Sequence, residues 1–457
     1  MEQKILLSNT LTKKTEEFVP INGKKVNIFV CGPTVYDYPH LGHAKAYIQF
    51  DFIVRYLRYR GYEVTYVQNI TDIDDKIIKR SQEKGVSWDE LAREFETIFL
   101  EDMAALHNIS VTKYARATDY IGQIVKQIKV LLDKGFAYQI SDGIYYEVSK
   151  FAEYGKLSGR TELREEDAVS RIDENKEKRG WNDFCLWKLS KDGEPFWETE
   201  LGKGRPGWHI EDTAITESFF GPQYDIHGGA VDLIFPHHEA EIAQMEAASG
   251  KKPLVRYWLH VGFLNIDSAK MSKSKGNFKT IREAMKEYDG RVLRYLFISS
   301  HYRSTMDFLE TTLEQAKNSL RRMQDFVENV DININKPEEK KLIEELKENV
   351  ETALNNDFDT PTAMATIFDF IRAQNSKGIS GKYIYDYFVE INKFFDFFDF
   401  EKKEIPEEIQ ILADERLITR KAGNWAESDK LRDLIKEKGY VIEDLKNDCK
   451  IKKLVIS

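Results

Sequence analysis

Cysteine is scarce in this sequence, with three residues in 457, at positions 31, 185 and 449. Three thiols cannot build the disulfide framework that stabilises many small secreted proteins. Long apolar runs are missing too, since none approaches the ~18 residues that cross a bilayer. The first residues, MEQKILLSNTLTKKTEEF, are charged and lack the apolar core of a signal peptide. We therefore expect a cytoplasmic protein that does not enter a membrane.

An excess of positive charge is also absent. The net charge of −10 at pH 7 argues against a uniformly basic nucleic-acid binder, although local lysine and arginine patches can still bind phosphates. With 42% hydrophobic and 32% charged residues, the chain is typical of globular proteins, and its length predicts several domains. Eight of its nine histidines lie at or before residue 260, and none follows His301. We therefore expect the chemistry in the first two-thirds of the chain.

Residues 29–50, FVCGPTVYDYPHLGHAKAYIQF, organise the first part of the chain. A predicted strand over Val26–Cys31 ends in a Gly-Pro turn, and a predicted helix covers His40–Tyr59. The free N–H groups and the dipole of a helix N-terminus favour anions. His40 and His43 would share one helix face there, and Gly42 leaves room for a flat ring to approach the backbone. Cys31, at the end of the strand, is a possible metal ligand.

The pattern around this stretch predicts an α/β fold with a parallel sheet. A second strand over Glu63–Ile70 completes a βαβ unit, and such sheets bind ligands beyond the carboxyl ends of their strands. A helical stretch follows over Trp88–Lys134, and residues 135–207 read as an insertion. Further predicted elements are a strand at Tyr224–Gly229, a helix at Pro236–Ser249, a strand at Tyr257–Leu264, and long helices from Leu309 broken at Pro337, Pro361 and Pro406.

Residues 270–277, KMSKSKGN, form a strongly cationic stretch. Taken alone it fits an ordinary solvated loop, just as two nearby histidines alone fit a hydrogen-bonded pair. Considered together with a helix N-terminus that binds anions, the stretch suggests a lid whose ammonium groups meet a triphosphate. Transition states that carry phosphate need such charge stabilisation more than they need a nucleophile.

These motifs resemble those of a known enzyme family. HLGH, at residues 40–43, resembles the HIGH signature of class I aminoacyl-tRNA synthetases, and KMSKS at 270–274 is identical to their second signature. The flanking stretches are similar to those of cysteinyl-tRNA synthetases and occur in the same order: FVCGPTVYDYPHLGHA, NITDIDDKIIKR, GRPGWHIE, YDIHGG, DLIFPHHEAEIAQ and NNDFDTPTA. The resemblance covers essentially the whole chain and implies ATP-dependent ligation of L-cysteine to tRNA(Cys).

The resemblance also implies one zinc ion per chain. His237 and Glu241 are four residues apart on a predicted helix, a spacing that lets two side chains hold one metal ion. The family's zinc ligands match Cys31, His237 and Glu241, whereas its second cysteine, in W-H-I-E-C, is replaced by Asp212. Since carboxylates also bind zinc, we hypothesise that Asp212 completes the site. The zinc would select the substrate thiol over the hydroxyl of serine.

Other roles carry over by match alone. His40, Gly42, His43, Lys270 and Lys273 would bind ATP together with Mg²⁺. Both histidines and both lysines would be catalytic, because they meet the phosphates as negative charge builds up. Gly32, Thr34, Thr71, Asp72, Trp208 and His227 would contact cysteine, and Gly229 and Asp232 would meet the adenosine. Without the resemblance, a tryptophan or a glycine-flanked histidine would be read as a packing residue.

The family further implies how the chain divides into domains. The expected parts are a Rossmann-like catalytic domain in two halves (1–134 and 208–269), the insertion (135–207), a mobile-loop and stem-contact region (270–308), a helical bundle contacting tRNA (309–400), and a small anticodon-binding domain (401–457). In the last part, Arg416, Arg420, Lys421, Lys430 and Arg432 offer phosphate contacts, and core packing is favoured over base stacking for Trp425. The tail LKNDCKIKKLVIS departs from the family, and a basic strand with Lys450, Lys452 and Lys453 would replace it.

Two alternatives stay open. A related ligase joins cysteine to a small amino-sugar instead of tRNA, and a homologue without catalytic activity would only bind tRNA or nucleotide. The long C-terminal helices favour the synthetase over the first alternative, and intact His40, His43, Lys270 and Lys273 argue against the second. We expect a monomer.

Overall fold

The computed structural model describes residues 3–160, 175–266, 269–270, 279–378, 380–401, 405–444 and 449–453. Its centre is a five-stranded parallel sheet in the order β5–β4–β3–β11–β12. The strands are β3 Lys25–Val30, β4 Glu63–Ile70, β5 Lys113–Arg116, β11 Tyr224–Ala230 and β12 Val255–Val261. The predicted parallel α/β sheet is therefore confirmed, with β3 and β11 meeting where the strand order reverses.

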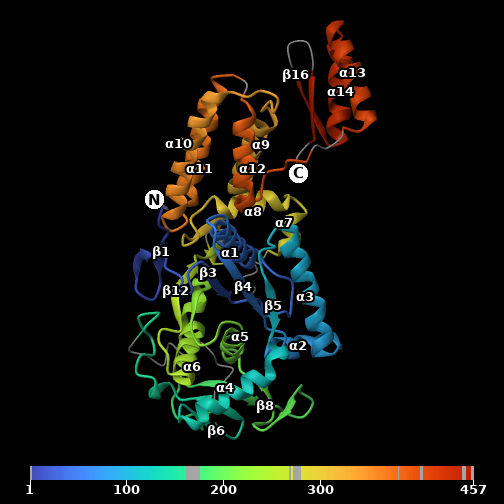
Figure 1. The fold of residues 1–457 in the computed structure, drawn as a ribbon. Helices are drawn as coiled ribbons and strands as arrows, with labels where there is room; N and C mark the ends of the chain where they lie inside the picture. Colours follow the sequence, from blue (N-terminus) through green and yellow to red (C-terminus); the bar gives the residue numbers. More distant parts are fainter. Residues whose placement is uncertain are drawn as a thin grey trace.

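Helices cover both faces of this sheet (Figure 1). On β3, Val26, Ile28 and Val30 pack on the side of α1, while Phe29 and Cys31 pack on the opposite side with the insertion and helices α4 to α6. Such two-sided burial explains why the last three residues of β3, Ile28, Phe29 and Val30, are all apolar. The helices of this part are α1 Leu41–Tyr59, α2 Asp75–Lys84, α3 Trp88–Ala105, α4 Ile121–Asp133, α5 Ile210–Phe220 and α6 Glu239–Ser249.

A second, antiparallel sheet lies between the two halves of the first one along the chain. Its order is β6–β7–β8–β10–β9, with β6 Ala137–Ile140, β7 Gly143–Tyr146, β8 Phe184–Leu189, β9 Trp197–Thr199 and β10 Gly202–Pro206. Smaller sheets join β1 Leu6–Asn9 to β2 Lys14–Glu17, and β13 Leu264–Ile266 to β14 Ala269–Lys270 and β15 Met306–Phe308.

The rest of the chain is mainly helical and extends away from the sheet (Figure 1). Its elements are α7 Ile281–Met285, α8 Gly290–Ile298, α9 Glu310–Glu328, α10 Pro337–Asn355, α11 Thr360–Asn375, α12 Lys382–Phe395, α13 Glu407–Lys421, α14 Trp425–Glu437, β16 Tyr440–Asp444 and β17 Cys449–Lys453. Helices α9 to α12 form a bundle above α1, and α13 and α14 form a separate unit at the far end. Among the described residues, no helix has the length and apolar character needed to span a membrane.

Three predicted elements need correction. The helical stretch over Trp88–Lys134 is broken after Ala105, and β5 lies between α3 and α4, because pairing with β4 outweighs the local helical pattern. Helix α6 begins at Glu239 rather than at Pro236, since Ile234–His238 forms a wider π turn with extended backbone at Phe235. The strand predicted over Tyr257–Leu264 is interrupted at residues 262–263, between β12 and β13.

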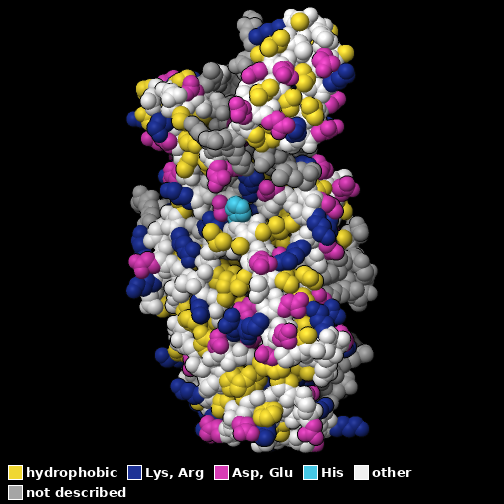
Figure 2. Space-filling model, turned by 90° about the vertical axis from the view of Figure 1, so that its right-hand side faces the viewer, with side chains coloured by type: hydrophobic (Ala, Val, Ile, Leu, Met, Phe, Trp, Pro, Cys, Tyr) yellow, Lys and Arg dark blue, Asp and Glu magenta, His cyan; other side chains and the backbone are white. Residues whose placement is uncertain are grey.

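The C-terminal unit also differs from its prediction. Trp425 is 60% exposed, so the favoured core reading is wrong, and the Arg420 guanidinium lies 5.7 Å from its ring centre. Arg416 is buried and donates to the Asp444 carboxylate at 2.6 Å, which also accepts from Arg420 and Arg432. Arg416 is therefore unavailable for the expected phosphate contact. The face in Figure 2 mixes acidic and basic side chains, and hydrophobic ones show both on the upper unit and in patches lower down.

Candidate functional site

The site lies at the carboxyl ends of β3 and β11, where the strand order of the main sheet reverses. The Cys31 N–H donates to the Gly228 carbonyl at 3.1 Å, which extends the pairing of the two strands. Parallel α/β sheets bind ligands in the crevice that opens at such a reversal. Cys31 and His227 are thus brought together from positions almost two hundred residues apart in the chain.

Helix α1 presents two histidines at its N-terminus. His40 is the N-cap, and its ring accepts a hydrogen bond from the His43 N–H at 3.3 Å, while the His43 Nδ1 accepts from the His40 N–H at 3.4 Å. The two rings stack with centres 3.7 Å apart. Because both Nδ1 atoms accept, both Nε2 atoms are left to carry the ring protons and act as donors. The pair is therefore held rigidly as a source of N–H groups at a helix N-terminus, where anions bind well.

A buried cluster of possible metal ligands lies beyond the end of β3. The Cys31 Sγ is 3.5 Å from Asp212 Oδ2 and 3.8 Å from Glu241 Oε1. The His237 Nε2 is 2.9 Å from the same Asp212 oxygen and 3.1 Å from the same Glu241 oxygen. Four donor atoms from β3, α5, the π turn and α6 thus lie within 4.8 Å of one another. One metal ion can be held by this set.

The chemistry of the cluster fits a cation. Burial, and then the charges of Glu241 and Asp212, raise the pKa of the Cys31 thiol well above its usual value. Burial and the Asp212 charge likewise raise the pKa of Glu241. In addition, Asp212 Oδ1 and Glu241 Oε2 are buried and accept no hydrogen bond from the described residues. Crowded, buried acidic groups of this kind are stable when a cation neutralises them.

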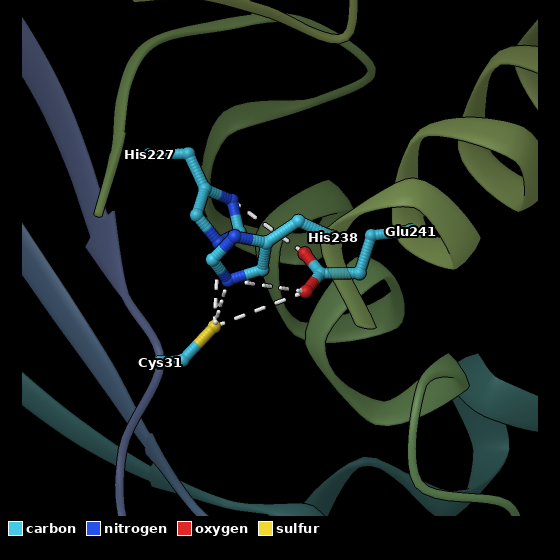
Figure 3. A group of neighbouring side chains, drawn as sticks. All are labelled: Cys31, His227, His238 and Glu241. Carbon is cyan, nitrogen blue, oxygen red and sulfur yellow. Dashed lines mark hydrogen bonds and ion pairs between the residues drawn. The ribbon is translucent and has the colours of Figure 1, made fainter. Parts of the chain in front are cut away.

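A second group shares Cys31 and Glu241 with the first (Figure 3). The Cys31 Sγ is 3.3 Å from His227 Nε2 and 3.1 Å from His238 Nε2. The outer nitrogens of the two rings are bonded in turn, His227 Nδ1 to the Tyr224 hydroxyl at 2.6 Å and His238 Nδ1 to His260 at 2.9 Å. These partners fix the orientation of both imidazoles. The Cys31 thiol therefore lies between the carboxylates of Asp212 and Glu241 on one side and the imidazoles of His227 and His238 on the other.

The wall between β3 and β4 is built from backbone contacts and one buried carboxylate. The Gly32 N–H donates to Asn69 Oδ1 at 2.5 Å, and a Cβ at Gly32 would lie 1.7 Å from the Asn69 carbonyl oxygen. Only glycine fits there. Glu211 accepts hydrogen bonds from Asn69 at 3.2 Å and from the Thr71 hydroxyl. Asp72 is turned away from this wall, because it pairs with Arg93 and accepts from Thr118.

A cavity of about 360 Å³ reaches from Cys31 and Gly32 at the end of β3 to His40 and His43 at the N-terminus of α1. It is lined by most of the residues that the sequence predicted for binding: Cys31, Gly32, Thr34, His40, Gly42, His43, Trp208, Gly229 and Asp232. Thr71 and His227 lie behind this lining. Lys270, in β14, is described only by its backbone, which pairs with Asn265 of β13, and Lys273 lies outside the described residues. The chain after this motif returns to α1, where Leu41 N–H donates to the Lys279 carbonyl at 3.2 Å.

Sequence reasoning missed several residues of the site. His209 is buried and its Nδ1 lies 2.7 Å from His237 Nδ1, so it orients a possible ligand. Glu211 precedes Asp212 in the WHIED stretch, and His238 follows His237 directly. Each was adjacent to a residue that had been singled out, and that adjacency was the available signal. His260 had none, because only the fold brings it to His238.

Comparisons with known proteins agree with this geometry. The family model described as "tRNA synthetases class I (C) catalytic domain" matches residues 17–318. A cysteine–tRNA ligase of Methanococcus maripaludis (strain C7) is 44% identical over 463 residues, covering 95% of this chain and 96% of that protein. One of Thermococcus gammatolerans is 43% identical over 467 residues, covering 96% and 97%. One of Thermoplasma acidophilum is 44% identical over 443 residues, covering 95% and 97%.

Among solved structures, methionyl-tRNA synthetase of Mycobacterium tuberculosis in complex with methionyl-adenylate aligns with a TM-score of 0.60. It is 16% identical in sequence, and the alignment covers 81% of this chain and 87% of that one, so the likeness concerns the fold. The sequence matches, in contrast, are high and extend over nearly the full length of the chain. This chain belongs to the cysteine–tRNA ligase family of class I tRNA synthetases.

Proposed function

We propose that this chain joins L-cysteine to tRNA(Cys) in two steps. The cysteine carboxylate first attacks the α-phosphate of ATP, so that cysteinyl-adenylate forms and pyrophosphate leaves. A hydroxyl of the 3′-terminal ribose of the tRNA then attacks the adenylate carbonyl, and AMP leaves. One observation carries the proposal: Cys31 of the buried thiol cluster and the stacked pair His40 and His43 line the same cavity.

In the proposed reaction, residues at the N-terminus of helix α1 bind the phosphates of ATP. The Nε2–H groups of His40 and His43 can donate to phosphate oxygens as negative charge builds up on the leaving pyrophosphate. Their mutual stacking and their backbone bonds fix them before ATP arrives, so little reorganisation is needed. Lys270 and Lys273 remain part of the proposal through their motif, and Mg²⁺ would accompany the ATP.

The residues around the end of β3 would bind the cysteine substrate. Gly32 and Thr34 line the cavity beside Cys31, and Trp208 closes it, stacking on His237 with ring centres 4.3 Å apart. Thr71, held by Glu211, would orient the substrate ammonium group. A zinc ion bound by Cys31, Asp212, His237 and Glu241 would supply a soft contact that a thiolate makes well and a hydroxyl makes poorly.

Cysteine-dependent exchange between ATP and labelled pyrophosphate tests the first step. We expect robust exchange with cysteine, at least ~100-fold less with serine, and loss of ~100-fold or more in His43→Ala, since a donor to the developing charge is removed. Addition of tRNA(Cys) should then give cysteinyl-tRNA and release AMP. Serine used as well as cysteine would contradict the proposed selectivity.

The same assay separates the alternatives. A cysteine:amino-sugar ligase would show exchange without charging tRNA and would release AMP with an amino-sugar acceptor. A homologue that only binds tRNA would show no exchange at all. Helices α9 to α14 favour the tRNA acceptor, because they extend far beyond the cavity and a small acceptor has no need of them (Figure 1). We also propose a monomer, which sedimentation can test.

A further inference from the structure

Lys45 lies on α1, two residues after His43, and its side chain is buried at 1% exposure. Its ammonium group donates to three backbone carbonyls, Gly262 at 2.7 Å, Phe263 at 3.0 Å and Ser304 at 2.7 Å. No carboxylate of the described part of the chain forms an ion pair with it. The positive charge is therefore held inside the protein by carbonyl dipoles alone.

Such an arrangement is costly. An ammonium group taken out of water without a counter-charge loses much of its solvation, and burial lowers the pKa of Lys45 to about 8. If the position served packing only, an apolar side chain of the same length would fill it at lower cost. The role of the Lys45 charge is therefore to be sought in the three carbonyl groups that it binds.

These carbonyls belong to two segments that lie in close contact. One is the break between β12 and β13 at residues 262–263, and the other is the turn that leads into β15. The Gly262 N–H donates to the Tyr302 carbonyl at 2.9 Å, and the Met306 N–H donates to the Phe263 carbonyl at 3.0 Å. A Cβ on Gly262 would lie 2.5 Å from the Ser304 oxygen. Their carbonyl oxygens converge on one point, and the Lys45 ammonium group removes the repulsion between them.

The first of these segments is also a wall of the site. Residues 261–264 line the cavity together with Gly42, His43, Ala46 and Tyr47 of α1. Lys45 thus connects α1, which carries His40 and His43, to residues 262–263 in the facing wall of the cavity. The same wall continues through β13, which pairs with β14 at Lys270.

We propose that Lys45 is a positioning residue for ATP: its ammonium group holds the backbone of residues 262–263 against α1 and so sets the shape of the nucleotide side of the cavity. Lys45 does not line the cavity and touches no reacting atom. This inference rests on the proposed function, because it assumes that the cavity takes ATP.

Gln49 provides a matched control one helical turn later on the same face of α1. It is also 1% exposed, and its Nε2 donates to the carbonyls of Phe297 at 2.6 Å and Ser300 at 3.1 Å. Neither carbonyl belongs to a residue of the cavity lining. Gln49→Met therefore removes similar buried hydrogen bonds without releasing the cavity wall.

The test compares Lys45→Met, Lys45→Arg and Gln49→Met in cysteine-dependent pyrophosphate exchange and in thermal unfolding. We expect Lys45→Met to raise the KM for ATP ~10-fold or more, because small displacements of a binding wall weaken binding strongly, while the KM for cysteine stays within ~2-fold. Lys45→Arg keeps the charge and should restore the KM for ATP to within ~3-fold of wild type. Gln49→Met should lower the melting temperature and leave the KM for ATP unchanged.

Other outcomes would overturn the inference. If Lys45→Met and Gln49→Met affect the KM for ATP equally, or if Lys45→Met raises both KM values together, Lys45 only supports the fold. If Lys45→Met is insoluble, Lys45→Gln takes its place with the same expectation, since it keeps two donors but no charge. A wild-type protein without exchange would contradict the proposed function, and calorimetric titration with ATP would then still decide whether Lys45→Met weakens nucleotide binding.

Discussion

Asp212 stands where the family stretch W-H-I-E-C, which this sequence resembles, has its cysteine. Its carboxylate is 1% exposed and shares a buried space with a thiol, an imidazole and a second carboxylate. One of its oxygens lies against both Cys31 and His237, and the other accepts no hydrogen bond within the described residues. A carboxylate is a harder ligand than a thiolate, so a bound ion would be more Lewis acidic here.

We predict that Asp212 is needed to hold the metal. Protein purified without chelators should contain about one equivalent of zinc, and Asp212→Asn should retain less than about half of that, because an amide is a neutral and poor zinc ligand. Asp212→Cys should keep the zinc and, after exchange for cobalt, show a stronger sulfur-to-metal absorption than wild type. Elemental analysis and absorption spectra measure both effects.

Wild-type protein with less than half an equivalent of zinc would contradict this prediction. So would Asp212→Asn with a full equivalent, which would place the metal among Cys31, His227, His238 and Glu241 instead. Both readouts are independent of activity, so they distinguish loss of metal from loss of catalysis.

Sequence motifs predict many of the residues around the cavity but few of the residues that hold them in place by hydrogen bonds. Cys31, Asp212, His237 and Glu241 could be named because each lies in a recognisable stretch. His260 could not, since only the fold brings β12 beside the π turn that carries His238. Lys45 lies within a predicted helix and carries no motif of its own, and only its three carbonyl partners point to the proposed role.

At the scale of elements, the turn between α10 and α11 places part of the NNDFDTPTA motif inside the protein. The stretch NNDFDTPTA lies in the bundle for which tRNA contact is expected, and within it Asp357 is 4% exposed and Phe358 is 1% exposed. Asp357 and Phe358 adopt left-handed backbone, with φ of 57° and 55°. Asp357 accepts from the Ser8 N–H and the Tyr302 hydroxyl, both at 2.8 Å, and pairs with Arg303 at 2.8 Å. The turn therefore joins the bundle to β1 and to the chain before β15.

Asp357→Ala should lower the free energy of unfolding by about 3 kcal/mol or more, because it leaves a buried N–H, a buried hydroxyl and a guanidinium without their acceptor. Asp359→Ala, at the N-cap of α11, is the control and should cost only about 1 kcal/mol. Denaturant unfolding gives both values. If Asp357→Ala instead weakened tRNA binding at unchanged stability, the tRNA contact would be real and the structural role wrong.

Element prediction succeeded where the local pattern and the tertiary environment agreed. Strand β4 was predicted with its observed bounds, and α1 within one residue, because Pro39 before the helix and Gly61 after it mark where the two elements begin and end. Strand β5 failed because four residues carry little pattern and owe their conformation to β4. Trp425 failed because helical spacing does not tell which face of an isolated hairpin has something to pack against.

For the whole molecule, α1 is the element that connects the cavity to the helical bundle. Its Asp51 is fully buried and pairs with Arg294 of α8 at 2.7 Å and with Arg55 at 2.7 Å. Arg294 also donates to the Phe395 carbonyl at the end of α12, at 2.7 Å, and Arg55 pairs with Asp396 at 2.9 Å. One ionic network thus joins the sheet domain, α8 and the bundle.

Breaking this network should affect the tRNA step more than the ATP step. Arg294→Met leaves Asp51 buried with less compensation, so we expect a loss of about 3–5 kcal/mol in stability, as for other buried pairs that lose one partner. The bundle should then be held less firmly above α1. Exchange should stay within ~3-fold of wild type, whereas the kcat/KM for tRNA should fall ~10-fold, because the proposed tRNA complex spans both the catalytic domain and the bundle.

Lys129→Met is the control for this change, since Lys129 of α4 pairs with Glu200 and the two side chains are 43% and 59% exposed. An exposed pair contributes about 0–1 kcal/mol, so this variant should keep both its stability and its tRNA kinetics. Calorimetry should show one unfolding transition for wild type and a broadened or split one for Arg294→Met. Equal losses in exchange and in tRNA charging would mean that the network supports the catalytic domain alone, and the alignment of the bundle would then depend on the apolar contacts between α1 and α12.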